Sequence, residues 1–144
     1  MKHDWLSALE QGLVGRQCVI CRRECDWSVA LEGGGGISIA VPWRIVASGR
    51  IAFADTDDRQ QFGLPAPIDG EAEANRLISG KAITRLSINE ETADLSLHFG
   101  DAARLDLFNH SMAYEGWDIA LTPETGGLRV IALGGGELAI FNDR

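Results

Sequence analysis

Three cysteines near the N-terminus have the residue types of a metal or redox site. Cys18, Cys21 and Cys25 are separated by two and three residues. A structural zinc site needs four ligands in a tetrahedron, and no fourth ligand lies nearby in the sequence. The segment also has the pattern of a β-strand, in which positions 18 and 21 point to opposite faces. We therefore interpret them as ordinary cysteines, with metal binding or redox sensing as the alternative.

Two glycine runs and one acidic stretch could be taken for phosphate or calcium loops. Residues 33–36 and 134–136 are all glycine, but each leads into a strand-like run and not into the N-terminus of a helix. We interpret both runs as hairpin turns. Residues 55–58 open like a calcium loop, but Arg59 stands where an oxygen ligand is required. No catalytic residue, metal or cofactor is predicted.

A short aromatic and acidic stretch is the best candidate for a binding surface. Tyr114, Glu115 and Trp117 lie within four residues of one another. Tyrosine and tryptophan are favoured at binding surfaces, and a neighbouring carboxylate could orient a basic partner. Trp43 and Arg44 are also candidate binding residues, because they begin a segment that resembles the one beginning at Trp117. The alternative is that the tryptophans are buried in the core of a sheet.

Short β-type runs separated by turns must position these residues. Much of the chain alternates apolar and polar residues with the period of a strand that buries one face. In the clearest cases, Leu95 and Leu97 are predicted to face the core, while Arg104 and Asp106 face water. Strands are predicted at residues 17–23, 26–32, 37–41, 45–54 with a break near 48–49, 83–88, 94–99, 104–108, 114–121, 129–133 and 137–141, short helices at 4–13 and 71–79, and a surface connection at 55–70.

The predicted fold class is mainly β with a minor α contribution, in which antiparallel sheets are built from two similar meander halves with one or two short helices. Shifting the sequence on itself by 66 positions brings Val29 onto Leu95 and Ile39 onto Leu105, which predicts an internal duplication. The alternative is that any two amphipathic hairpins align at some offset. The predicted single domain covers residues 1–144, with halves 16–54 and 81–142 joined by residues 55–80.

The charge balance disfavours several classes of partner. The chain has 13 basic and 21 acidic residues and a formal net charge of −8, which repels nucleic acid and anionic membranes alike. No nucleic-acid or membrane partner is therefore predicted. The N-terminus lacks the apolar core of a secretory signal, and no stretch approaches the ~20 apolar residues that span a bilayer. The expected location is the cytoplasm.

The C-terminal part of the sequence resembles a known group of proteins. Phe-Gly-Asp at 99–101 is followed by Tyr-Glu-Gly-Trp at 114–117 and by Gly-Gly-Gly-Glu-Leu at 134–138. This layout resembles a family of small, uncharacterised bacterial β-rich proteins, some of whose relatives look like immunity or partner-binding proteins of bacterial toxin systems. The resemblance covers residues 95–140 and implies a β-rich bacterial domain that binds another molecule.

Two classes of function are weighed for this chain. The first is a non-enzymatic binding protein, such as an immunity-like inhibitor of a basic partner protein, which an acidic chain with exposed aromatic residues would suit. The second is a small-molecule binder or enzyme with a pocket between the two β halves, which would need a concave site with converging polar groups. Because the sequence contains no catalytic constellation, we favour the first.

The last predicted strand suggests self-association. Residues 137–141 carry a single charge and no proline, so they lack the features that usually stop a sheet edge from pairing with another chain. We expect a twofold homodimer, the commonest assembly of soluble proteins. In the alternative, the N-terminal helix covers this edge through Trp5, Leu6 and Leu9 and keeps the chain monomeric.

Overall fold

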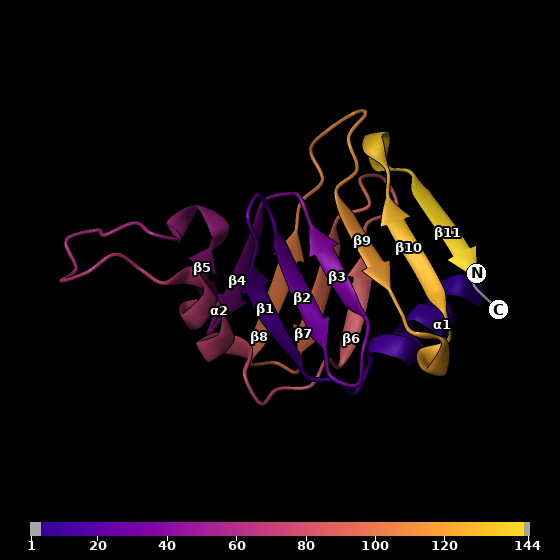
Figure 1. Cartoon of the computed structure of the whole chain (residues 1–144), viewed down its shortest axis with the longest axis horizontal. Helices are drawn as coiled ribbons and strands as arrows, with labels where there is room; N and C mark the ends of the chain where they lie inside the picture. The colour runs from indigo at the N-terminus through magenta and orange to yellow at the C-terminus, as the bar shows by residue number, and fades with distance from the viewer. Residues whose placement is uncertain (1–3, 143–144) are drawn as a thin grey trace.

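The computed structural model describes residues 4–142 as two antiparallel β-sheets packed face to face, with an α-helix at each side (Figure 1). The first sheet has the order β1-β2-β3-β9-β10-β11 and the second β5-β4-β8-β7-β6. The mainly β fold class with minor α content is thus confirmed. The first sheet contains β1 (Cys18–Arg22), β2 (Trp27–Leu31), β3 (Gly36–Ile39), β9 (Trp117–Ala120), β10 (Leu128–Ala132) and β11 (Leu138–Asn142). The second contains β4 (Trp43–Ala47), β5 (Arg50–Ala54), β6 (Arg85–Ile88), β7 (Leu95–Phe99) and β8 (Ala103–Leu107).

The core lies between the two sheets and follows the alternation of each strand. Leu95 and Leu97 face inward and are fully buried, as predicted. Trp43 packs edge-on against Trp27, with 5.0 Å between the ring centroids. Asp106 differs from its prediction: it lies on the outer face but is only 4% exposed, because two arginine side chains cover it.

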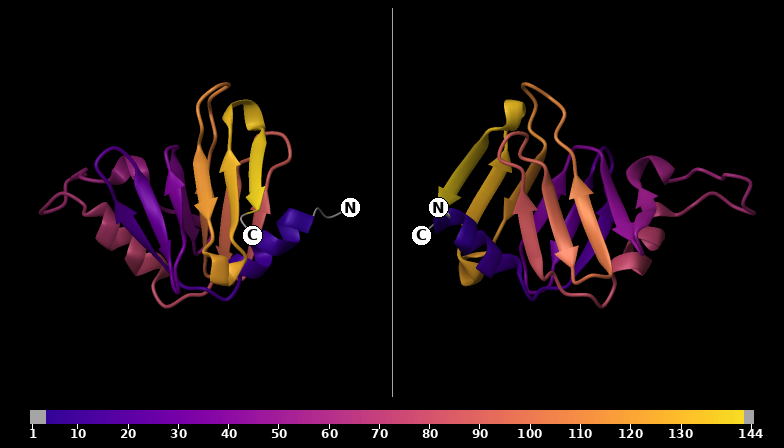
Figure 2. Two further views of the ribbon diagram at one scale, coloured as in Figure 1. Left: turned by 45° about the vertical axis from the view of Figure 1, so that its right-hand side comes forward. Right: turned by 180° about the vertical axis from the view of Figure 1, so that it is seen from behind.

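One helix packs at each side of the sandwich (Figure 2). Helix α1 (Asp4–Leu13) buries Leu9 and Leu13 and packs against β10 and β6. Helix α2 (Gly70–Ile78) begins after Asp69, whose side chain accepts a hydrogen bond from the N–H of Ala72, and packs mainly against β1. Neither α-helix within residues 4–142 has the length and apolar character needed to cross a membrane.

The two halves of the chain share the same connectivity over five strands, and the second half adds a sixth, β11. In residues 16–54, β1, β2 and β3 form a meander in the first sheet, and the chain then crosses to the second sheet for β4 and β5. In residues 81–142, β6, β7 and β8 form a meander in the second sheet, and the chain then crosses to the first for β9, β10 and β11. The halves are joined in each sheet, because β3 pairs with β9 in the first sheet and β8 pairs with β4 in the second. A duplicated origin stays a prediction.

The strand registers correct the offset that relates the two halves. Val29 pairs with Ile37 in the first half, and Leu97 pairs with Leu105 in the second. The equivalent positions therefore differ by 97 − 29 = 68 residues, and not by 66. The 66-residue offset holds only for the outer strands β1 and β6, because the turn from β6 to β7 is two residues longer than the turn from β1 to β2.

The connection between β5 and α2 extends away from the sandwich, as expected for residues 55–70 (Figure 1). It begins with a 3₁₀ turn, η1 (Asp55–Asp57). Its base is held by Asp58, whose carboxylate accepts two hydrogen bonds from the Arg22 guanidinium, at 2.8 and 2.7 Å, and one from the N–H of Gly70. The hydrogen bonds from Arg22 lower the pKa of Asp58 against the opposing effect of burial. The stretch that opens like a calcium loop thus serves as a structural anchor.

Candidate functional site

The five predicted binding residues do not form one site. Trp43 and Trp117 are each only 1% exposed and face the core, so neither is available to a partner. The indole N–H of Trp117 donates to the carbonyl of Ala93, at 2.8 Å, which satisfies its polar group inside the protein. The alternative interpretation, a tryptophan buried between sheets, is correct for both residues. Their burial follows from strand alternation, since Trp43 pairs with Leu107 and Trp117 with Ile39 at inward-facing positions.

Arg44 lies on the outer face of the second sheet, in an ion-pair network. Its Nε donates to Asp106 at 3.1 Å, and its guanidinium carbon lies 4.9 Å from the centroid of the Phe108 ring. Arg104 donates to the same carboxylate at 2.8 Å, and the hydroxyl of Ser96 donates at 2.7 Å. Burial raises the pKa of Asp106, but the hydrogen bonds from Arg104, Ser96 and Arg44 outweigh it, so the pKa is lowered. We interpret this network as structural.

Tyr114 and Glu115 lie in an exposed loop between β8 and β9, and not on a strand as predicted. The loop projects beyond the end of the sandwich (Figure 1). Tyr114 is 83% exposed, and Met112, which the sequence did not single out, is 90% exposed. Glu115 is also exposed. The loop therefore presents two large apolar side chains and one carboxylate to solvent.

Hydrogen bonds fix the backbone of this loop. The hydroxyl of Ser111 accepts from the N–H groups of Ala113 and Tyr114, at 3.1 and 2.9 Å. The side-chain amide of Asn109 donates to the carbonyls of Thr92 and Ala93, at 3.1 and 2.7 Å. The loop is thus held both by its own turn and by the neighbouring turn between β6 and β7.

A third turn supports the loop from the other side. It contains η3 (Gly134–Gly136), and the N–H of Gly135 donates to the carbonyl of Ser111 at 2.9 Å. A Cβ on Gly134 would lie 2.4 Å from backbone atoms of Ala113, and one on Gly136 would lie 2.2 Å from the carbonyl oxygen of Glu91. The glycine run is therefore more than the hairpin turn that was predicted, because it also lets the two other turns approach closely. We call residues 89–94, 108–116 and 133–137 together the loop end.

The loop end is strongly acidic. Its three segments contain no lysine or arginine. Four exposed carboxylates have no ion-pair partner among the described residues. One of them, Glu115, attracts Arg129 electrostatically from a longer distance, but Arg129 already forms an ion pair with Asp118. These four are Glu90, Glu91, Glu115 and Glu137. Because they come from three separate turns, folding concentrates negative charge around Met112 and Tyr114.

The three cysteines do not come together as ligands. Cys18 is buried, and burial raises the pKa of its thiol to about 12. Cys21 lies half-buried on the opposite face of β1, as the strand pattern predicted, and Cys25 is exposed in the following turn. Within residues 4–142 no group of three or more His, Cys, Asp or Glu side chains is placed to hold a metal ion. Metal binding by these cysteines stays an alternative without geometric support.

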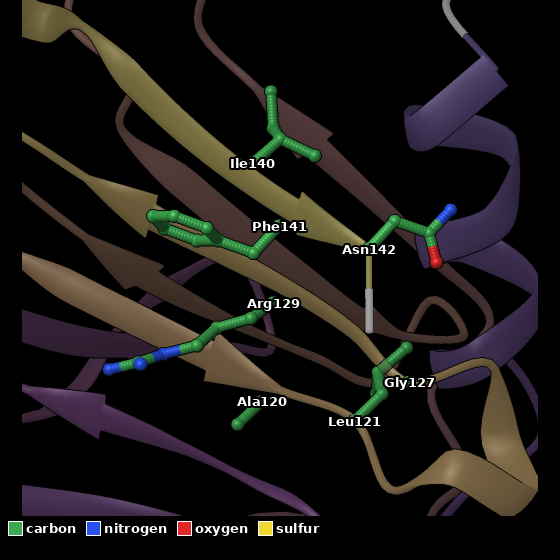
Figure 3. Close-up of a pocket in the computed structure, with 7 residues that line it drawn as sticks. All are labelled: Ala120, Leu121, Gly127, Arg129, Ile140, Phe141 and Asn142. Carbon is green, nitrogen blue, oxygen red and sulfur yellow. The ribbon is translucent and has the colours of Figure 1, made fainter. Parts of the chain in front are cut away.

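A surface hollow of about 650 Å³ lies along β9, β10 and β11 (Figure 3). It is not the pocket considered for the second class of function, because its lining comes from the second half alone. A second surface hollow, of about 550 Å³, does span the two halves over β2, β3, β9 and β10. The space between the sheets is filled by apolar side chains from both inner faces. The hollow in Figure 3 is lined by Ala120, Leu121, Gly127, Arg129, Ile140, Phe141 and Asn142.

Comparison of the chain with protein-family models, curated proteins and solved structures found no match. The resemblance of residues 95–140 to small bacterial proteins therefore stays a prediction.

Proposed function

We propose that this chain is a non-enzymatic binding protein of the bacterial cytoplasm that uses its loop end to bind a basic partner protein, as an immunity-like inhibitor would. The proposal depends chiefly on Met112 and Tyr114, which are almost fully exposed on a loop whose backbone is fixed by hydrogen bonds. Large apolar side chains that bury nothing in their own chain are typical anchors of protein interfaces.

The fixed backbone makes these two side chains effective anchors. Ordering a free backbone costs roughly 1–2 kcal/mol per residue, and a loop that is already ordered avoids that cost on binding. Full burial of a side chain such as methionine contributes about 1.5–3 kcal/mol. Met112 and Tyr114 together could therefore supply several kcal/mol of binding free energy.

The carboxylates around the anchors specify the kind of partner. Glu90, Glu91, Glu115 and Glu137 are exposed, and together with the net charge of −8 they favour a basic surface. Complementary charge speeds association and rejects acidic proteins, and its effect weakens as salt screens it. The complex should therefore lose affinity with rising ionic strength.

The alternative, a small-molecule binder or enzyme with a pocket between the β halves, has less support. Core side chains fill the space between the two sheets, so a pocket between the β halves can lie only at the surface, where a hollow of about 550 Å³ spans β2 and β3 of the first half and β9 and β10 of the second. The titratable groups with shifted pKa values also have structural explanations, such as the network of Asp106 and the anchor of Asp58.

Affinity capture from a bacterial lysate tests this proposal. The immobilised proteins are the wild type, a Met112→Ala/Tyr114→Ala double variant, and a Phe62→Ala control, which removes another exposed aromatic from the connection at residues 55–69. We expect a basic protein to bind the wild type and the control, to be absent from the double variant, and to elute as salt is raised. If the double variant captures the same protein as well as the wild type does, the loop end is not the binding surface.

A further inference from the structure

The edge of the first sheet at β11 is open, in contrast to the opposite edge. At β1, the N–H of Ile20 donates to the side chain of Asn75 and the carbonyl of Ile20 accepts from it, both at 2.8 Å. The N–H of Arg22 donates to Glu71 at 2.8 Å. Helix α2 thus satisfies the edge of β1 with its side chains, as a further strand would.

No such cover lies over β11 among the described residues. Helix α1 packs against β10 and β6, and it leaves Ile140 38% exposed and Phe141 53% exposed. Helix α1 approaches β11 at its end, where Ala8 and Gln11 line a hollow together with Asn142. The alternative in which α1 covers this edge through Trp5, Leu6 and Leu9 and keeps the chain monomeric is an outcome that the mass measurement below distinguishes. The strand itself, residues 138–142, carries no charge and no proline.

The hydrogen-bond pattern shows which backbone groups of β11 face outward. Bonded and non-bonded pairs alternate along an antiparallel ladder. The N–H of Leu133 donates to the carbonyl of Glu137, so the pairs of Ile131 with Ala139 and of Arg129 with Phe141 are bonded as well. The N–H and C=O groups of residues 138, 140 and 142 therefore point away from β10, and no hydrogen bond to them is made by residues 4–142.

We propose that β11 pairs in antiparallel fashion with β11 of a second copy of this chain, around a twofold axis at Ile140. The two six-stranded sheets then form one continuous sheet. Ile140 is the middle of the three outward-facing residues, so this register lets all of them bond, with about six hydrogen bonds across the seam. It also makes the interface the same on both copies, as twofold symmetry requires.

The side chains of β11 are self-complementary in this register. On the outer face, Phe141 of each copy lies opposite Ala139 of the other, so a large side chain meets a small one. Figure 3 shows Phe141 beside Arg129 on one side of the strand and Ile140 on the other. On that second face the two Ile140 side chains meet at the axis. A partner of another sequence would need to reproduce this match, which is why we assign the edge to a second copy.

Charge gives the homodimer a distinctive dependence on salt. Each copy carries a net charge of −8, so the two copies repel each other overall, while β11 itself carries no charge. Salt screens this repulsion, so the dimer should become tighter as ionic strength rises. Binding of a basic partner at the loop end should change in the opposite direction, so the two proposals can fail independently.

Light scattering after gel filtration tests the dimer, at loading concentrations from about 10 to 100 µM, a range suited to modest affinity. We expect a dimer mass for the wild type and a monomer mass for Ile140→Lys, which places two lysines opposite each other at the axis. Ile51→Lys, at an exposed isoleucine of β5, is the matched control and should remain dimeric. Asn142→Pro removes only an outward-facing N–H, and it should weaken the dimer at least tenfold while the melting temperature stays close to that of the wild type.

Disulfide trapping tests the register. In a Cys21→Ser/Cys25→Ser background, Ile140→Cys places two thiols at a bonded pair with Cα atoms about 5.5 Å apart, within the range of a disulfide. Phe141→Cys places them roughly 8 Å apart, too far to bridge. We expect mild oxidation to give a covalent dimer only for Ile140→Cys. A monomeric wild type at the highest concentration, or a dimer that neither Ile140→Lys nor Asn142→Pro weakens, would overturn the proposal.

Discussion

Replacing Gly134 by alanine should disturb the loop end specifically. The added Cβ would lie 2.4 Å from the N, Cα and C atoms of Ala113, and backbone cannot move aside as the end of a flexible side chain can. The φ angle of Gly134 is not in the left-handed region, so the effect is steric and not conformational. To relieve the clash, the loop carrying Met112 and Tyr114 has to move away.

The expected cost follows from two contributions. Overpacking of this kind costs about 1–3 kcal/mol. Separation of the turns also breaks the hydrogen bond from the N–H of Gly135 to the carbonyl of Ser111, worth about 0.5–1.5 kcal/mol. The two costs do not add in full, because the movement that relieves the steric clash is the same movement that breaks this bond. We expect a loss of about 2 kcal/mol in the free energy of unfolding, or roughly 6 °C in Tm for a domain of this size.

Urea denaturation measures the stability, and hydrogen exchange at the amides of Tyr114 and Gly135 reports on the loop end. The control is Gly100→Ala, where φ is 64° and no other atom lies within 4 Å of the added Cβ. That substitution should cost about 1–2 kcal/mol through the left-handed conformation alone and leave exchange at the loop end unchanged. If Gly134→Ala keeps wild-type stability and wild-type protection at both amides, the proposed support of the loop by the glycine turn is wrong.

Three further predictions concern the rest of the molecule. Asn75→Ala should lower the free energy of unfolding, measured by urea denaturation, by about 1–3 kcal/mol because it leaves the backbone N–H and C=O of Ile20 without their partner. Arg76→Ala, on the exposed side of the same helix, should lower it by less than about 0.5 kcal/mol. Equal effects would contradict the role of Asn75. Because folding lowers the pKa of Asp106, its carboxylate stabilises the fold above its unfolded pKa of about 3.9, and this stability is lost as pH falls through the folded pKa. Asp106→Asn should therefore make Tm fall less steeply at acid pH than in the wild type. An equally steep fall would count against the network. Addition of a chelator should leave Tm unchanged, and a clear fall would restore Cys18, Cys21 and Cys25 as candidate ligands.

Most of the fold was predictable because strand alternation is a local signal. The predicted strand at residues 94–99 agrees with the observed β7 at Leu95–Phe99 to within one residue, because every second side chain there is apolar. The predicted strand at residues 114–121 was too long, and β9 begins only at Trp117. The backbone N–H of Tyr114 is bonded to Ser111 in a turn, and a local side-chain bond of this kind competes with a sheet ladder without changing the hydrophobic pattern.

The candidate site was only partly predictable. Tyr114 and Glu115 could be chosen from residue type, but Met112 has no distinguishing neighbour in the sequence. Glu91 and Glu137 join the site because distant turns pack together, and that packing depends on glycines whose close approach cannot be read from spacing. Trp117 was chosen for its type, but its position on a strand decided its burial.

Titration calorimetry of the captured basic partner against the purified chain tests the central claim most directly. We predict that Met112→Ala/Tyr114→Ala weakens binding by about 100-fold, equivalent to roughly 3 kcal/mol, that Phe62→Ala binds like the wild type, and that added salt weakens the wild-type complex. An affinity that stays at the wild-type value in a correctly folded double variant would contradict the claim that the loop end is the binding surface.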